Sequence, residues 1–208
     1  MVIGLLLVTA IPAVTGISQA MHAQRTREER LKDEKRMKRF NIDVFCEDED
    51  SLAKGVDGKR LVLKDDRVWI GPEKAVKPCP HGYVAECFYI EYPDNERNPA
   101  PLGLVSQVQD DPPLLNWIYV DKNTMELKYG NKSASIEHHV GPWDWTADEV
   151  GITFEKKRKR FIAVENPKTY KWQVYYDMNN DGLIGFVPQQ RHGVQVYLKR
   201  TLLPEPDA

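Results

Sequence analysis

Four residues near the carboxyl end of the chain have the spacing of a calcium-binding loop. Asp177, Asn179 and Asp181 stand at alternate positions, and Gly182 follows them. Oxygen ligands at alternate positions can converge on a hard cation, and a glycine permits the sharp turn. The twelfth position of such a loop is Pro188 here, where a bidentate Glu is needed, and the flanks read as strands. Because an Asn-Asp-Gly hairpin turn accounts for the same residues, calcium is the less favoured of two interpretations.

Soft metal ligands gather in the sequence CPHGYVAEC. Cys79, His81 and Cys87 could hold zinc if Cys46 joined them, but the spacing is not that of a recognised zinc motif. Three cysteines in 208 residues are too few for a disulfide scaffold, and an odd number fits a reducing compartment. Free thiols are therefore expected, and no cofactor is predicted. If the body is secreted, a bridge between Cys79 and Cys87 and glycosylation of Asn131, in the sequence NKS, become the features to test.

Two tryptophans in the sequence GPWDWT, Trp143 and Trp145, are the best candidates for ligand contact. Exposed indole rings stack on sugars, lipids or partner side chains with a large contact area and few rotamers to lose. Buried tryptophan is commoner than exposed tryptophan. The favoured interpretation is therefore that one or both rings close the end of the core, with Thr146 and Glu149 forming a capping box for one helical turn.

No pattern in the chain predicts a catalytic residue. A nucleophile elbow, a zinc-protease helix, a phosphate loop and a dinucleotide fingerprint are all missing from the sequence. His138 and His139 are adjacent, and neighbours in a strand point to opposite faces, so they cannot easily share a substrate. Glu137, Asp144 and Asp148 lie near them in the sequence and could build an acid-base site only through folding. An enzyme is the least favoured class.

The elements that must position these residues begin with an apolar segment. Residues 1–24 contain no Asp, Glu, Lys or Arg, and a helix of about 20 residues can span a bilayer. Pro12 and Gly16 weaken this segment. We predict a hydrophobic membrane segment that anchors a single-pass protein with its body facing the cytosol, because the positive charge follows the segment. The alternative is a cleaved signal peptide, with Ser18 and Ala20 before the cleavage point, and secretion.

Residues 25–40 are predicted to form a basic helical connector. Residues 25–39 hold eight Lys or Arg and four Asp or Glu, and Glu28 precedes Lys32 by four residues, which supports a helix. Each basic side chain near a membrane surface is attracted to anionic lipid headgroups by roughly 1 kcal/mol. The residues predicted to contact the membrane surface are Arg25, Arg27, Arg30, Lys32, Lys35 and Arg36.

Residues 41–208 are predicted to form one β-rich globular domain. The chain holds 29 basic and 31 acidic residues, so the part after the connector has 21 basic and 27 acidic side chains. A mildly acidic body argues against general nucleic-acid binding, which requires a basic surface. A length of about 170 residues suits one domain with a proper core.

Short alternating segments between turn residues indicate about ten strands and an all-β fold, a single sandwich or barrel-like domain, preceded by the hydrophobic and basic helices. The proline-rich residues 95–113 are expected to form one long loop. A strand at 83–92 is expected without a named partner, and a strand at 194–198 closes the series. The expected hairpins are 59–63 with 67–71, 116–120 with 125–129, 152–154 with 161–164, and 170–176 with 183–187.

Two charged runs are expected at the surface. The acidic run 47–50, EDED, is interpreted as an exposed loop that could also fold back on the basic helix. The basic run 156–160, KKRKR, is interpreted as a solvated hairpin tip, with a second membrane-surface contact as the alternative.

The sequences DDPPLLNWIYVDKNTMELKYGN at 110–131, GPWDWT at 141–146 and WQVYYDMNNDGL at 172–183 resemble an uncharacterised family of ascomycete fungal proteins. Those proteins also begin with a short uncharged segment followed by a polar, basic stretch. The resemblance covers most of the chain and is weakest around residues 48–80. It implies a fungal source and a shared compact β-domain, and it supplies no activity. The run KKRKR departs from the family, whose members carry an uncharged turn there.

These features favour a membrane-tethered, non-catalytic β-domain that acts as an adaptor or binding module for an unknown protein partner. The alternative is a secreted fungal β-protein with a cleaved N-terminal signal peptide. The predicted partners are the membrane, through the N-terminal segment, and anionic lipid headgroups. Nucleic acid is not among them.

Overall fold

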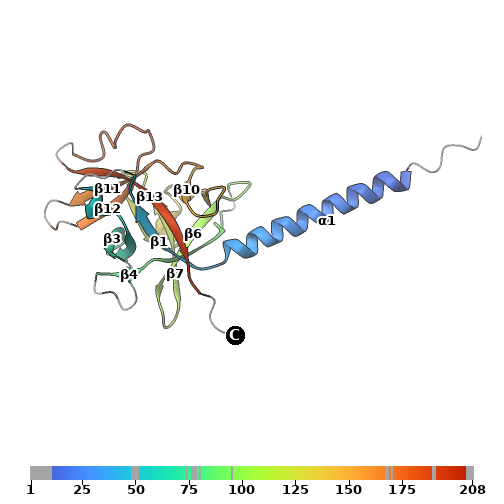
Figure 1. Ribbon diagram of the computed structural model, residues 1–208, viewed down its shortest axis with the longest axis horizontal. Helices are drawn as coiled ribbons and strands as arrows, with labels where there is room; N and C mark the ends of the chain where they lie inside the picture. Colours follow the sequence, from blue (N-terminus) through green and yellow to red (C-terminus); the bar gives the residue numbers. More distant parts are fainter. Residues whose placement is uncertain are drawn as a thin grey trace, which may run out of the picture. The chain divides into compact units, whose positions relative to one another are not determined.

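The computed structural model describes residues 11–47, 52–73, 75, 79, 81–94, 96–166, 169, 171–188 and 191–204, with side chains described from Gln24 onward except at residue 73. The chain divides into two units, Met1–Met37 and Lys38–Ala208, and each is considered by itself. Figure 1 shows the helix of the first unit and the strands of the second.

The first unit contains one continuous helix, α1 (Ile11–Arg36), where the sequence predicted an apolar segment and a separate basic connector. Pairs one turn apart support its second half: Gln24 donates to Glu28 at 3.0 Å, and Arg30 lies 3.6 Å from Glu34. The connector was predicted to reach residue 40, but the helix ends at Arg36. Within the described residues, α1 included, no helix offers a stretch that is both long and apolar enough to cross a bilayer. Residues 1–10 of the predicted membrane segment lie outside the described part.

The second unit is built from strands, as predicted. Its described residues contain one turn of 3₁₀ helix, η1 (Ala53–Gly55), one short helix, α2 (Lys132–Ser135), and thirteen strands. The strands are β1 (Phe40–Phe45), β2 (Lys59–Lys64), β3 (Arg67–Glu73), β4 (Tyr83–Val84), β5 (Glu86–Glu91), β6 (Leu102–Gln109), β7 (Leu114–Val120), β8 (Leu127–Gly130), β9 (Trp143–Trp145), β10 (Ile152–Phe154), β11 (Phe161–Asn166), β12 (Lys171–Tyr176) and β13 (Gly193–Leu202).

Antiparallel pairing joins most of these strands into one closed sheet. Its order is β12, β11, β13, β1, β5, β6, β7, β8, β3, β2 and β4, and a further pairing of β12 with β3 closes the ring. Strands β9 and β10 form a separate hairpin. Because a closed ring has no free edge along its length, a barrel of this kind satisfies its backbone groups internally. The prediction of an all-β, barrel-like domain is confirmed.

The two hairpins predicted with turn residues at their tips are present. β2 and β3 pair with Lys64 opposite Arg67, and β7 and β8 pair with Val120 opposite Leu127. The strand predicted at 83–92 is also present, but it is divided into β4 and β5. These hairpins matter for function because their tips and faces carry most of the polar side chains described below.

Other strand predictions were wrong. Residues 95–113 were expected to be a loop, yet they contain β6, which pairs along its length with β5 and β7. β10 pairs with β9 and not with β11, which lies between β12 and β13. Residues 183–187 are turns and bends and not a strand. The short β9 segment contains two tryptophans and was not predicted as a strand, which is why the partner of β10 was missed.

The interior of the barrel is filled by large apolar side chains. Phe40, Leu61, Phe161 and Tyr176 are all less than 2 % exposed and belong to one continuous cluster. Phe161 and Tyr176 face each other across β11 and β12, with ring centroids 5.3 Å apart. Burial of such side chains supplies most of the driving force for folding.

Candidate functional site

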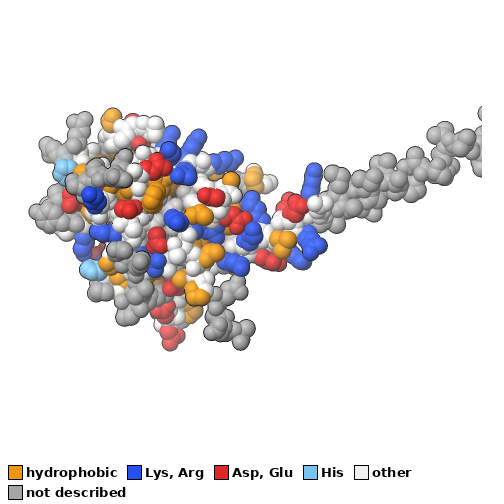
Figure 2. Space-filling view, in the orientation of Figure 1, with side chains coloured by type: hydrophobic (Ala, Val, Ile, Leu, Met, Phe, Trp, Pro, Cys, Tyr) orange, Lys and Arg blue, Asp and Glu red, His pale blue; other side chains and the backbone are white. Residues whose placement is uncertain are grey.

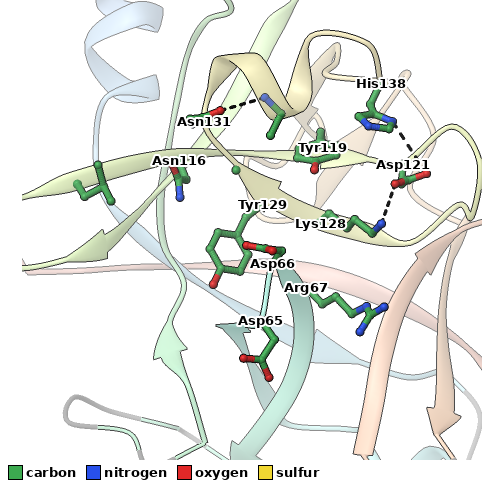
Figure 3. A pocket seen from close by; sticks show the side chains of 13 residues that line it. Asp65, Asp66, Arg67, Asn116, Tyr119, Asp121, Lys128, Tyr129, Asn131 and His138 are labelled. Atoms are coloured by element: carbon green, nitrogen blue, oxygen red, sulfur yellow. Dashed lines mark hydrogen bonds and ion pairs between the residues drawn. The ribbon is translucent and has the colours of Figure 1, made fainter.

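A cavity of about 730 Å³, here named the turn pocket, lies where the β2–β3 turn meets β7, β8 and α2. Its volume is within the range of small-molecule sites. Figure 3 shows the side chains that line it and the elements that carry them. The residues that line it are Asp65, Asp66, Arg67, Leu114, Asn116, Tyr119, Asp121, Lys128, Tyr129, Gly130, Asn131, Ala134 and His138.

The β2–β3 turn brings two carboxylates to one side of the turn pocket. Asp65 and Asp66 have positive φ values of 52° and 58°, which is the conformation of a type I′ hairpin turn. Asp tolerates this conformation better than most residues. The backbone N–H of Tyr129 donates to the carbonyl of Asp66 at 3.2 Å, which fixes the turn against β8. Both aspartates are exposed, so their carboxylates are accessible to a ligand.

The opposite wall comes from the β7–β8 hairpin. Tyr119 and Lys128 are register partners and therefore lie on the same face of the sheet. The Lys128 ammonium lies 2.7 Å from a carboxylate oxygen of Asp121. The ring of Tyr119 stacks on the imidazole of His138, with centroids 5.0 Å apart. Nδ1 of His138 accepts a hydrogen bond from the backbone N–H of Lys122 at 3.2 Å. An ion pair, a ring stack and a hydrogen bond from the backbone thus hold these side chains in place.

The charge of the Asp121 and Lys128 pair is fixed by its surroundings. Partial burial opposes ionisation of Asp121, but the hydrogen bonds from Lys128 and from the backbone of Asn123 outweigh it, so the pKa of Asp121 lies below its usual value. Burial likewise opposes the charge on Lys128, but Asp121 and the nearby Glu126 outweigh it and the pKa of Lys128 lies above its usual value. Both groups are therefore charged near neutral pH.

Two phenol groups keep their protons in the turn pocket. Burial is the main cause that raises the pKa of Tyr119 and of Tyr129. A neutral phenol can donate one hydrogen bond and accept another. The rings also supply flat apolar surface beside the polar groups.

A third side of the turn pocket is the start of α2. Asn131 is the N-cap of this helix, and its side-chain oxygen accepts from the backbone N–H of Ala134 at 2.9 Å. A Cβ atom at Gly130 would lie 3.0 Å from the Cβ of Ala134, so glycine lets the helix start close to β8. Asn131 is exposed, and its glycosylation stays a prediction.

The tryptophans proposed as ligand contacts have different positions. Trp143 is 0 % exposed, and its Nε1 donates to the carbonyl of Ile118 at 3.2 Å. It therefore has no surface to offer a ligand: the exposed-contact interpretation was wrong, and the favoured interpretation of a buried ring is confirmed for Trp143. Trp145 is only partly buried, with its ring edge-on to Tyr89 and 4.5 Å from the guanidinium carbon of Arg200. These contacts occupy Trp145 within the domain.

The capping box predicted beside the tryptophans is not formed. Thr146 accepts from the backbone N–H of Gly151 at 2.8 Å, across the loop between β9 and β10. Glu149 has a positive φ of 58°, which a helical turn does not contain. The segment is a hairpin loop because β9 and β10 pair on either side of it.

The candidate calcium ligands belong to a tight loop after β12. Both carboxylate oxygens of Asp177 accept backbone hydrogen bonds, from Asp181 at 3.1 Å and from Gly182 at 2.8 Å. Asn180 and Gly182 have positive φ, as turn residues do. Asn179 and Asp181 are exposed. Calcium binding by Asp177, Asn179 and Asp181 stays a prediction, and the hydrogen bonds of Asp177 explain the loop by themselves.

The three cysteines form no disulfide bond with one another. Cys46, Cys79 and Cys87 are all free thiols, and burial raises the pKa of Cys87 to about 12. A buried neutral thiol of this kind is inert. Across the described part of the chain, no group of three or more His, Cys, Asp or Glu side chains is arranged to hold a metal ion.

The basic residues predicted to contact a membrane surface lie on α1. Arg25, Arg27, Arg30, Lys32 and Lys35 are exposed, and Arg36 is half-buried and lies 3.3 Å from Asp33. The second basic run, 156–160, is exposed up to Lys159. Arg158 and Lys159 both approach the carboxylate of Glu47, at 3.5 and 3.8 Å. The rest of the acidic run, residues 48–50, lies outside the described part.

Sequence reasoning missed the turn pocket. Its residues come from separate segments, and only pairing of β3 with β8 brings Arg67 opposite Lys128. The hairpin tip at Asp65 and Asp66 was predicted, so its two exposed carboxylates were the available signal.

The closed barrel and its polar cavity define a class: an all-β domain with a ligand-sized pocket at a hairpin tip. The family model described as the fungal beta-trefoil domain matches residues 16–204. The chain therefore belongs to the fungal beta-trefoil domain family. This confirms a fungal, β-rich family, whereas the narrower ascomycete placement stays a prediction. No curated protein and no solved structure matches the chain.

Proposed function

We propose that this protein is a non-catalytic binding module whose turn pocket holds a hydroxyl-rich ligand such as a sugar. The observation that carries the proposal is the convergence of acceptors, donors and ring faces in one cavity. The carboxylates of Asp65 and Asp66 can accept from hydroxyl groups, and the amide of Asn116 can donate and accept. The rings of Tyr119 and Tyr129 offer apolar surface to the C–H face of a sugar ring.

The ion pair of Asp121 and Lys128 fits a binding role for this part of the turn pocket. General acid-base catalysis needs a group whose pKa lies near the working pH. The buried carboxylate, Asp121, has its pKa moved away from neutrality and is held by Lys128. An ion pair of this kind orients neighbours and does not exchange protons near pH 7.

The N-terminal part of the proposal is membrane attachment, with the β-domain in the cytosol. It is supported by the uncharged residues 1–24 and by the exposed cations of α1. The partners on this proposal are the membrane and its anionic lipid headgroups, and an unknown protein partner if the module acts as an adaptor. The competing proposal, secretion, is favoured by the exposed Asn131 in the sequence NKS. Expression of the full chain, followed by fractionation and N-terminal sequencing, separates the two.

The experiment that tests the binding proposal is a glycan array, with hits measured by isothermal titration calorimetry on the full chain. The Asp66→Asn variant removes one charge and leaves a residue that tolerates positive φ. We expect it to weaken sugar binding by about tenfold, the effect of one charged hydrogen bond. The matched control, Asp181→Asn, removes an exposed carboxylate outside the pocket. Equal affinities of all three proteins would refute the proposal.

A further inference from the structure

A second cavity lies on the other side of the β2–β3 turn and differs from the turn pocket in charge. This cavity, here named the lysine pocket, has a volume of about 380 Å³. Three lysines, Lys59, Lys64 and Lys171, and one aspartate, Asp65, are its charged residues. The other residues that line it are Val62, Trp69, Ile70, Gly71, Pro72, His81, Thr169 and Trp172.

The lysine pocket is positively charged, whereas the β-domain as a whole carries a net negative charge. From residue 40 onward the chain has 27 acidic and 21 basic residues, and Figure 2 shows both signs interspersed over the visible face of the β-domain. Among the described side chains, no ion pair engages Lys59, Lys64 or Lys171. Lysines that line one cavity and form no ion pair with a described side chain are available to an anion.

An indole ring beside the lysines gives the pocket a flat apolar surface. Trp69 is half-buried and packs against the cluster of Val62 and Val84. Its Nε1 donates to the backbone carbonyl of Lys64 at 3.0 Å, which fixes the ring. Trp69 and Val62 are register partners, so both lie on the same face of the sheet. Gly71, on that face of β3, adds no side chain: a Cβ there would lie 2.7 Å from Val62.

We propose that the lysine pocket is a binding site for a small organic anion that carries a ring, with the anionic group held by Lys59, Lys64 and Lys171 and the ring stacked on Trp69. Phosphate and carboxylate groups share the required chemistry, since both accept several charge-assisted hydrogen bonds. Ring stacking on a fixed indole adds affinity without requiring a particular ring. This site goes beyond the hydroxyl-rich ligand of the turn pocket.

The test is calorimetric titration of the full chain with two matched pairs of ring-containing probes: adenosine 5′-monophosphate against adenosine, and benzoate against benzamide. In each pair the charge is the main difference. We expect the charged member to bind about tenfold or more tightly than the neutral one, and raised salt to weaken it. Failure of both anions to bind at millimolar concentration, or equal binding of the neutral partners, would overturn the proposal.

Variants locate the binding. Lys64→Gln combined with Lys171→Gln removes two exposed charges. We expect this double variant to bind the anionic probes about tenfold or more weakly. Lys157→Gln, an exposed cation outside the pocket, should leave the affinity unchanged. The Asp66→Asn variant should also leave it unchanged, because Asp66 lines only the turn pocket. Anion binding that is insensitive to the lysine pair contradicts the site, whatever the outcome of the sugar experiment.

Discussion

At the scale of single residues, burial decides which side chains can contact a ligand. Trp143 has the residue type of a binding platform, yet it lies between Phe154 and Phe161 in the core. Trp69 was not singled out from the sequence, yet it lines a cavity. Burial of one or both tryptophans of GPWDWT was the interpretation favoured from the sequence, and it holds for Trp143. Nothing in the sequence distinguished Trp69.

Truncation of Trp143 should measure its structural role. Trp143→Ala removes a fully buried ring and its hydrogen bond to Ile118, so we expect the free energy of unfolding to fall by about 3–5 kcal/mol. Urea denaturation followed by circular dichroism measures the change. Ile184→Ala serves as control, because Ile184 is 64 % exposed and its loss should change stability by less than about 0.5 kcal/mol. A small effect of Trp143→Ala would show that the ring is not part of the core.

The low pKa of Asp121 predicts how stability depends on pH. A carboxyl whose pKa is lower in the folded than in the unfolded state stabilises the fold above its unfolded pKa, and the contribution is lost as the pH falls through the folded pKa. We therefore expect stability to decrease below about pH 4, where an unfolded aspartate begins to protonate. Asp121→Asn should be less stable at pH 7 and should lose less on acidification. An unchanged pH profile in this variant would contradict the assigned ion pair with Lys128.

At the scale of elements, turns and alternation were visible in the sequence, and partners were not. The β2–β3 and β7–β8 hairpins join neighbouring segments through recognisable turn residues, so both were predicted. β6 was missed because prolines on both sides of it, Pro101 and Pro112, suggested a loop. The partners of β10 and β12 could not be predicted, since barrel closure pairs β12 with β3 across about a hundred residues.

In the candidate site, too, the turn was predictable from the sequence and the long-range pairing was not. The β2–β3 turn, with its two aspartates, was predicted as a turn. Asn131 was predicted only as a glycosylation site of a secreted protein. The arrangement of Asp66, Tyr119 and Lys128 around one cavity depends on pairing of β3 with β8. Long-range pairing leaves no local signal in one sequence, so the turn pocket itself was not predictable.

A variant in the loop after β12 can distinguish a structural role of Asp177 from calcium binding. Asp177→Ala removes the acceptor for the backbone N–H groups of Asp181 and Gly182, and we expect a loss of about 1–3 kcal/mol in stability. The loss of stability should be the same whether the buffer contains calcium or a chelator. Thermal denaturation of both proteins under both conditions measures it. Stabilisation of the wild type by calcium, absent in the variant, would instead support the metal site.

At the scale of the whole molecule, charge is divided between an N-terminal basic stretch and a mildly acidic β-domain. This division is the basis of the proposed membrane attachment, and it was fully visible in the sequence. The described residues of α1 place its cations in solvent. Membership of the fungal beta-trefoil domain family describes the fold and leaves the ligand open.

Vesicle flotation tests the contribution of the basic helix. Replacing Arg25, Arg27, Arg30 and Lys32 with Gln should weaken binding to phosphatidylserine vesicles, by roughly 1 kcal/mol for each charge removed. Binding to neutral phosphatidylcholine vesicles should change little. Lys54→Gln with Lys199→Gln is the control, since these exposed cations belong to the β-domain and lie outside both basic runs. Equal loss on both kinds of vesicle would point to a structural effect and contradict the electrostatic account.

The most direct test of the central claim is an NMR titration of isotope-labelled protein with sugars selected on the glycan array. If the turn pocket is the binding site, changes in backbone amide shifts on titration will concentrate in residues 65–67, 116–121 and 128–138. The Asp66→Asn variant will need a higher sugar concentration to reach saturation. Shifts that concentrate in residues 177–188, or that stay unchanged in the variant, would contradict the assignment of this pocket.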